Sequence, residues 1–243
     1  MKSTSKTSSV KATVTWYGHS AFLLQAPGGV GVLVDPWLDN PKSPRGAVSG
    51  VDPGLILVTH GHADHLGNTV QVALRTGAVV VSIHEVCLYL RGKGVATAQG
   101  MNKGGTVECK GIKVSMVDAR HSSGIDIEDE VVPGGEAAGF VVELENGFRI
   151  YHAGDTSLFG DMKLIRDFHH PDVAILPIGG LYTMDPTQAA LACRMLLPRH
   201  IIGMHYGTFP ALAGSPSELK RFLPSELRRR VMKLEPGVAV QLG

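Results

Sequence analysis

Cysteine is scarce in this chain: its 243 residues include three, Cys87, Cys109 and Cys193. They lie far apart in the sequence, and no two of them have the CxxC spacing of metal-binding and redox motifs. This spacing argues against a disulfide framework and against a thiolate metal site. We interpret the three residues as core or surface thiols.

The chain also lacks a large net charge. Lys and Arg number 23 against 22 Asp and Glu, which leaves a formal net charge of +1. Positive and negative residues are nearly equal in number, which argues against a strongly basic surface. We therefore expect no nucleic-acid partner. Residues 1–10 are rich in Ser, Thr and Lys and contain no apolar run of the kind found in a signal peptide or membrane span. We therefore expect a disordered tail over 1–10, a cytoplasmic location and no membrane partner.

The remaining composition is that of a globular protein, with 44% hydrophobic residues and 30 glycines. A chain of this length can bury one large core, so we expect residues 11–243 to form a single domain. The hydrophobic patterns predict strands followed by helix–strand units, twice over, which suggests two sheets packed together with helices outside. The expected strands are 13–17, 21–25, 30–34, 55–59, 78–83, 106–110, 113–118, 139–145, 148–152, 172–178 and 201–205, and the expected helices are 65–75, 84–91 and 185–197.

The most informative segment follows the apolar strand predicted over 55–59. It places four side chains that can bind a metal within six residues: His60, His62, Asp64 and His65. Neutral imidazole and carboxylate are ligands that zinc accepts, and manganese or iron to a lesser degree. In open α/β sheets ligands bind at the carboxyl ends of strands, which is where this segment begins. A surface loop that is rich in His and Asp by chance is the alternative interpretation.

Three further donors follow predicted strands in the same way. His121 follows the strand over 113–118, Asp155 follows the strand over 148–152, and His205 ends the strand over 201–205. Gly154 and Gly207 lie beside two of them, where glycine allows a sharp turn and a close approach of the backbone to a ligand. We expect these donors to join the first cluster, with residues 124–135 forming a mobile loop near the site.

The four-donor segment matches the HxHxDH motif of the metallo-β-lactamase superfamily, which the chain resembles over nearly its whole length. The resemblance implies an α/β fold of α+β type, a four-layer αββα sandwich. It also implies a binuclear site, with two divalent metal ions in each chain. One metal would be held by His60, His62 and His121 and the other by Asp64, His65 and His205, with Asp155 bridging them. Zinc is the expected metal, and manganese, iron and nickel are the alternatives.

Further motifs, among them Gly18-His-Ser20 and Met204-His-Tyr-Gly207, resemble a narrower group of metal-dependent hydrolases related to L-ascorbate-6-phosphate lactonase. We expect a metal-dependent hydrolase that uses a metal-bound hydroxide on a small soluble ester, lactone or phosphoester. Two alternatives stay open: a phosphodiesterase acting on a nucleotide or lipid, and a non-catalytic metal-binding protein. The expected partner is a small-molecule substrate, and a homo-oligomer is compatible with the sequence.

Roles within the site are less sharply defined by the sequence. Asp64 is the candidate catalytic residue, because a carboxylate within hydrogen-bond reach of the attacking water can accept its proton or orient it. A plain ligand role for Asp64 is the alternative. Four further residues are candidates for substrate binding, with core packing, helix capping or loop packing as the alternatives: His19, His84, Thr183 and Tyr206.

Overall fold

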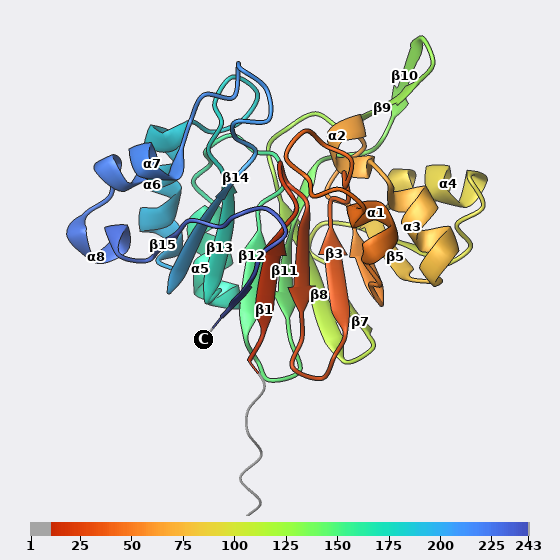
Figure 1. Ribbon diagram of the computed structural model, residues 1–243, viewed down its shortest axis with the longest axis horizontal. Helices are drawn as coiled ribbons and strands as arrows, with labels where there is room; N and C mark the ends of the chain where they lie inside the picture. The colour runs from red at the N-terminus through yellow and green to blue at the C-terminus, as the bar shows by residue number, and fades with distance from the viewer. Residues whose placement is uncertain (1–10, 243) are drawn as a thin grey trace, which may run out of the picture.

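The computed structural model describes residues 11–242, so the tail expected over 1–10 lies outside the described residues. Two seven-stranded sheets share one hydrophobic core, to which both halves of the chain contribute. Helices of the N-terminal half lie on the right of Figure 1, helices of the C-terminal half lie on the left, and the sheets lie between them. The predicted αββα sandwich is confirmed.

The first sheet begins with the predicted meander, in which the first three strands pair antiparallel. The next strands add in parallel, each reached through a helical or irregular connection on the outer side. The C-terminal strand returns to pair antiparallel with the first. In spatial order the sheet contains β16 (Ala239–Gln241), β1 (Thr13–Trp16), β2 (Phe22–Gln25), β3 (Gly31–Val34), β4 (Leu55–Leu57), β5 (Val79–Ile83) and β6 (Ala98–Met101).

The second sheet has the same plan, with an antiparallel part followed by a parallel part. All five residues of β13 are buried, as expected for a parallel strand covered on both faces. In spatial order the sheet contains β15 (Val231–Met232), β14 (His200–Met204), β13 (Val173–Pro177), β12 (Arg149–His152), β11 (Ala138–Glu143), β8 (Ile112–Asp118) and β7 (Thr106–Cys109).

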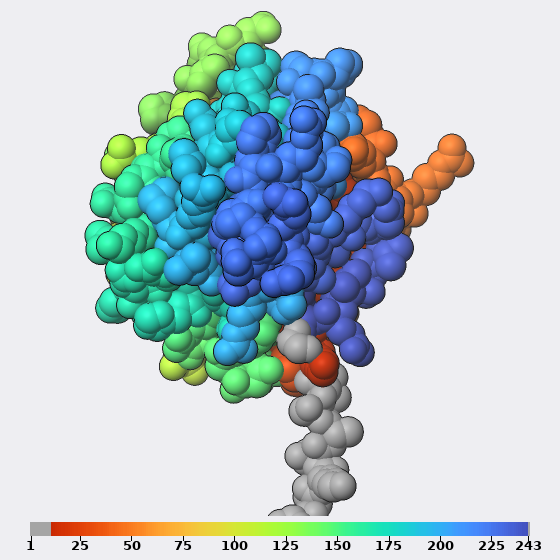
Figure 2. Space-filling model, turned by 90° about the vertical axis from the view of Figure 1, so that its left-hand side faces the viewer, coloured from red at the N-terminus to blue at the C-terminus, as the bar shows by residue number. Residues whose placement is uncertain are grey.

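The helices cover the outer faces of the two sheets, and in Figure 2 the blue C-terminal segments cover the side that faces the viewer. The best-capped helix begins after Asp185, whose side chain accepts hydrogen bonds from the backbone N–H groups of Thr187 and Gln188. The described helices are α1 (Ala47–Gly50), α2 (Ala63–Leu66), α3 (Thr69–Thr76), α4 (His84–Gly92), α5 (Met162–His169), α6 (Pro186–Leu196), α7 (Pro216–Phe222) and α8 (Ser225–Arg228).

Two local predictions were wrong. The helix expected over 65–75 is two helices, α2 and α3, divided at Gly67, which has φ +40°. A Cβ atom on Gly67 would lie 2.7 Å from the carbonyl oxygen of Pro36, so the chain turns at a residue without a side chain. The segment 124–135, expected as a mobile loop near the site, contains a regular antiparallel hairpin of β9 (Gly124–Ile127) and β10 (Glu130–Pro133) in place of an irregular loop. Its position near the site agrees with the prediction, because Asp126 lines a cavity together with His62 and Asp64. The hairpin projects at the upper right of Figure 1.

Candidate metal centre

All the predicted metal ligands lie at one edge of the sandwich, just beyond strand ends. His60 follows β4, His121 follows β8, Asp155 follows β12 and His205 follows β14. Because β3 to β5 are parallel and β12 to β14 are parallel, the carboxyl ends of these strands meet at common edges of the two sheets. The topology therefore brings together side chains that are far apart in the sequence.

The first donor group consists of His60, His62 and His121, whose ligand atoms all lie within 4.8 Å of one another. Nε2 of His60 lies 2.9 Å from Nδ1 of His62. His60 is fully buried, whereas His62 and His121 are partly exposed at the cavity surface. Three imidazole nitrogens that converge with one side open to solvent form a donor set suited to a catalytic zinc ion.

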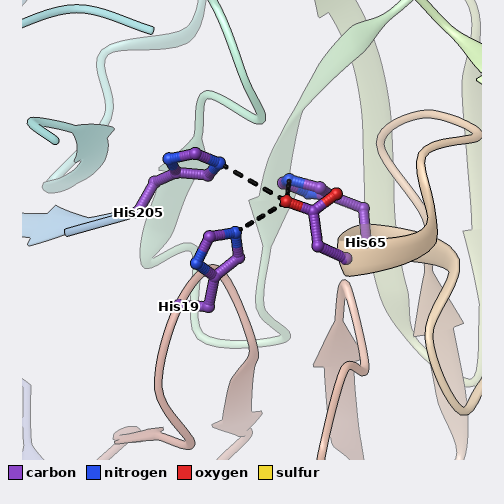
Figure 3. A group of neighbouring side chains, drawn as sticks. His19, His65 and His205 are labelled. Atoms are coloured by element: carbon purple, nitrogen blue, oxygen red, sulfur yellow. Dashed lines mark hydrogen bonds and ion pairs between the residues drawn. The ribbon is translucent and has the colours of Figure 1, made fainter. Parts of the chain in front are cut away.

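The second donor group contains His19, Asp64, His65 and His205. Figure 3 shows the three imidazole rings pointing toward one carboxylate. The Oδ2 atom of Asp64 lies 2.9 Å from Nε2 of His19, 3.7 Å from Nε2 of His205 and 3.9 Å from Nε2 of His65. The short helix α2 carries both Asp64 and His65, and this places them beside the loop that follows β14.

Asp155 lies between the two groups and is only 2% exposed. Its Oδ1 atom is 3.3 Å from Nε2 of His65, and its Oδ2 atom is 2.9 Å from Nε2 of His205 and 3.7 Å from Nε2 of His121. One carboxylate thus reaches donors of both groups. Together with His60 and His65, Asp155 also forms a third set of ligand atoms that lie within 4.8 Å of one another.

The donor set fits divalent cations. Among the described residues, Nε2 of His65 and Oδ1 of Asp155 are buried without a hydrogen-bond partner, although they face each other. Buried polar atoms are costly when they have no partner, and a metal ion would satisfy both. Imidazole nitrogen and carboxylate oxygen are ligands that zinc, manganese and iron share, so the donors fit without selecting one metal.

Asp35 holds one of the donor histidines, His65, in place. Its carboxylate accepts hydrogen bonds from the backbone N–H and from the hydroxyl of Thr59, both at 2.8 Å. Oδ2 also lies 2.7 Å from Nδ1 of His65. A carboxylate on the far nitrogen of a metal-binding histidine fixes the ring orientation and makes the facing nitrogen a better ligand. Asp35 therefore orients His65 toward the second donor group.

The charges of the centre act strongly on one another. Burial alone would raise the pKa of Asp155, but the imidazoles of His65 and His205 outweigh it and hold that pKa well below its usual range. Burial alone would lower the pKa of His65, but the carboxylates of Asp155, Asp35 and Asp64 raise it well above its usual range. The same negative field attracts a metal cation, so protons and metal compete for these donors.

Three residues at the centre have left-handed backbone conformations that side chains other than glycine rarely adopt. His19 has φ +50°, Asp35 has φ +47° and His205 has φ +54°. Such conformations cost about 1 kcal/mol or more each and are found where the surrounding structure holds them, often at functional sites. Here the backbone N–H of His205 donates to the carbonyl oxygen of His19 at 3.0 Å. The strained residues thus lie in the second donor group, which contains His19 and His205, or beside it, as Asp35 does.

The donors open into a cavity of about 350 Å³, lined by His62, Asp64, His121, Ser122, Asp155, Tyr182 and His205. Of the four residues proposed for substrate binding, His19 lies at the centre, where it contacts Asp64. None of the four, His19 included, is among the residues that line this cavity. His84 is exposed at the start of α4, Thr183 contacts the carbonyl oxygen of Met184, and Tyr206 stacks on Trp16 with ring centroids 5.2 Å apart.

Sequence reasoning missed two supporting residues as part of the site. Asp35 follows β3, so the strand-end rule that found the other donors applied to it as well. Thr208, whose hydroxyl lies 2.9 Å from Nδ1 of His19, carried no comparable signal. Its role depends on a contact between residues 189 positions apart in the sequence.

The fold and this donor set define a metal-dependent hydrolase of the metallo-β-lactamase type. A family model described as "Beta-lactamase superfamily domain" matches residues 13–205. The chain is 48% identical over 229 residues to a "UPF0173 metal-dependent hydrolase" of Rubrobacter xylanophilus, covering 92% of this chain and 94% of the relative. A relative of the same description from Methanosarcina barkeri is 45% identical over 96% of this chain and 100% of its own length. The chain belongs to the UPF0173 metal-dependent hydrolase family of the metallo-β-lactamase superfamily.

A solved structure agrees with this assignment. The chain resembles Igni18, a metallo hydrolase from the archaeon Ignicoccus hospitalis, at 37% identity and a TM-score of 0.85, over 96% of this chain and 99% of that one. The membership supports the predicted enzyme class and its dependence on metal. Separately, no helix within residues 11–242 is long and apolar enough to cross a membrane.

Proposed function

We propose that the chain hydrolyses a small soluble ester, lactone or phosphoester with the help of two divalent cations. The observation that carries the proposal is Asp155, which lies within 3.7 Å of donors from both groups. Zinc is the expected metal, with manganese, iron and nickel as alternatives. The residues that would hold the cations are His60, His62 and His121 in the first group, Asp64, His65 and His205 in the second, and Asp155 between them.

When bound, the cations would supply Lewis-acid activation of a water molecule and of the bond to be cleaved. Asp64 is the carboxylate best placed to orient an attacking water or to accept its proton. Its side chain is 31% exposed and borders the cavity, whereas the side chain of Asp155 is 2% exposed. A carboxylate at the cavity surface can accept a proton from an attacking water and release it to solvent. His19, which contacts Oδ2 of Asp64, holds that carboxylate in place.

The cavity supports a small-molecule substrate. Its volume of about 350 Å³ lies within the usual range for small-ligand pockets. Its side chains provide hydroxyl, imidazole and carboxylate groups close to the donor atoms. The sequence resemblance to ascorbate-6-phosphate lactonase makes lactones a first class to test, and soluble phosphodiesters are the second.

The proposal can be tested with protein reconstituted with zinc. We expect about two zinc ions per chain by elemental mass spectrometry, and turnover of a lactone or ester panel that exceeds turnover of bis(4-nitrophenyl) phosphate. Asp155→Ala should lower both metal content and turnover, because it removes the carboxylate shared by the two groups. Asp167→Ala, at an exposed residue of α5, serves as the control and should change neither.

Other outcomes would contradict the proposal in distinct ways. Preferential cleavage of bis(4-nitrophenyl) phosphate would favour the phosphodiesterase alternative. Two bound metals without turnover of any ester, lactone or phosphodiester would favour a metal-binding protein without catalysis. Wild-type metal content in Asp155→Ala would remove the structural basis of the proposed centre.

A further inference from the structure

A second cavity adjoins the metal centre. It has a volume of about 400 Å³ and is lined by Trp37, His62, Ala63, Asp64, Asp126 and Phe209. His62 and Asp64 line this cavity and the metal cavity alike. A molecule whose reacting group lies at the donors can therefore extend directly into the second cavity, which we call the side lobe.

The side lobe has an aromatic wall. The rings of Trp37 and Phe209 are stacked, with centroids 5.9 Å apart and planes 26° from parallel. Both rings also meet His19 edge-on, at centroid distances of 5.1 Å for Trp37 and 6.2 Å for Phe209. His19 thus links the aromatic wall to Asp64.

This aromatic wall is partly open to solvent. Phe209 is 43% exposed, and Trp37 is half-buried. Aromatic surface that is left exposed beside a reactive centre gains free energy when an apolar group covers it. The exposure of both rings therefore fits a surface that binds part of a ligand.

Within residues 11–242, the side lobe has no positively charged side chain of the lysine or arginine type. Among the described residues, neither the metal cavity nor the side lobe is lined by a lysine or an arginine. Asp126, on β9 of the projecting hairpin, adds a carboxylate to the side lobe beyond those of the donor groups. Away from the cations of the centre, a second anionic group on a substrate would therefore meet no cationic side chain in the side lobe, and Asp126 would repel it there.

We propose that the non-reacting part of the substrate is an uncharged apolar group, aryl or alkyl, which packs against Trp37 and Phe209 in the side lobe. This inference rests on the proposed hydrolytic function, which it narrows to esters and lactones with an apolar substituent. Trp37 and Phe209 are then specificity-determining residues. Substrates that carry a further phosphate or carboxylate, such as sugar phosphates, are disfavoured.

The test compares three hydroxamic acids that share one metal-binding group and differ in the tail: acetohydroxamic acid, 3-phenylpropanohydroxamic acid and succinic acid monohydroxamate. Their dissociation constants for the zinc-loaded protein are measured by calorimetry, which needs no turnover. We expect the phenyl tail to bind about tenfold more tightly than the methyl tail, since burial of an aromatic ring contributes at least that much. The carboxylate tail should bind no more tightly than the methyl tail.

Substitutions inside and outside the side lobe separate the contribution of the aromatic wall from general effects on affinity. Phe209→Ala should weaken the phenyl-tailed compound about tenfold and leave acetohydroxamic acid unchanged, because only the phenyl tail reaches the side lobe. Phe222→Ala is the matched control: Phe222 lies on α7, is 47% exposed against 43% for Phe209, and lines neither cavity. It should leave all three affinities unchanged.

A change of charge at Asp126 tests the claim that the side lobe disfavours anionic groups. Asp126→Lys should tighten binding of the carboxylate tail several-fold relative to the methyl tail, because it places a cation in the side lobe. Asp129→Lys makes the same change of charge in the turn of the hairpin, outside the side lobe, and should have a smaller effect.

The proposal is overturned if the phenyl tail binds no more tightly than the methyl tail, absence of binding by both included. It is also overturned if Phe209→Ala and Phe222→Ala behave alike, or if the carboxylate tail binds most tightly to the wild type. These measurements report binding alone. Selective hydroxamate binding without turnover of any ester would therefore contradict the proposed function and leave the apolar side lobe intact.

Discussion

Nε2 of His19 lies 2.9 Å from Oδ2 of Asp64, and the side chain of His19 is fully buried. The other ring nitrogen, Nδ1, lies 2.9 Å from the hydroxyl of Thr208. Burial lowers the pKa of His19 to about 4, even though the contact with Asp64 acts in the opposite direction. His19 is therefore neutral near pH 7, with one nitrogen donating and the other accepting. If the ring donates to Asp64, Thr208 is the donor on its other side.

His19 should act as a positioning residue for Asp64. We expect His19→Ala to lower kcat roughly 10- to 100-fold, the usual effect of removing a group that orients a metal ligand. KM should change less, because His19 lines neither cavity. The values of kcat and KM are measured by steady-state kinetics with the best substrate of the panel. Metal content is measured on the same samples. His200→Ala, at a partly exposed histidine on β14, is the control.

Thr208→Val provides a finer version of the same experiment. It removes the hydroxyl that contacts Nδ1 of His19 and keeps a side chain of similar shape. We expect a smaller loss of kcat than in His19→Ala, with metal content unchanged. Wild-type kinetics in both variants would mean that Asp64 needs neither residue to hold its orientation.

Asp35 should control metal affinity through His65. In Asp35→Asn one of the two accepting oxygens becomes an NH2 group, so the side chain is uncharged and can no longer accept from both the backbone of Thr59 and Nδ1 of His65. His65 therefore becomes a weaker ligand. We expect zinc affinity to fall roughly 10- to 100-fold, measured by competition with a chromogenic chelator. Asp172→Asn, a change at an aspartate outside the centre, is the control. Equal zinc affinity in Asp35→Asn and the wild type would contradict the role assigned to Asp35.

The sequence predicted the fold and the donor positions because both depend on local patterns. Apolar runs marked the strands, and the rule that ligands bind beyond the carboxyl ends of strands selected His121, Asp155 and His205. The structure brings these three together with the four-donor segment. Their roles as ligands stay a prediction until metal is measured.

Features that depend on contacts between residues far apart in the sequence could not be predicted from local patterns. The break between α2 and α3 arises because Gly67 passes close to the backbone of Pro36 and Trp37, and the helical pattern continues across it. Short elements at the end of the chain, such as β15 and β16, form only because partner strands are already in place. The side lobe depends in the same way on Trp37 and Phe209, which are far apart in sequence and have no periodicity in common.

Asp64 has two candidate roles that metal analysis can separate. If Asp64 is chiefly a ligand, Asp64→Ala should lose about one metal per chain together with activity. If Asp64 accepts the proton of the attacking water, Asp64→Ala should keep its metals and lose about 100-fold or more in rate, the usual contribution of a general base. Because Asp64 belongs to the second donor group, we expect the first result. Unchanged metal content with an unchanged rate would exclude both roles.

The cysteines should differ sharply in reactivity, because only the thiolate form reacts with alkylating reagents. Burial raises the pKa of Cys87 to about 11 and that of Cys193 to about 12, whereas Cys109 is partly exposed on β7. At pH 8 about one Cys87 thiol in a thousand would be ionised, and burial also blocks the reagent. We expect iodoacetamide to label Cys109 first in the native protein and all three equally after unfolding, measured by peptide mass spectrometry. Labelling of Cys87 or Cys193 as fast as Cys109 would show that the core opens around them. Activity that survives labelling of Cys109 would in turn agree with a centre built from imidazole and carboxylate groups alone.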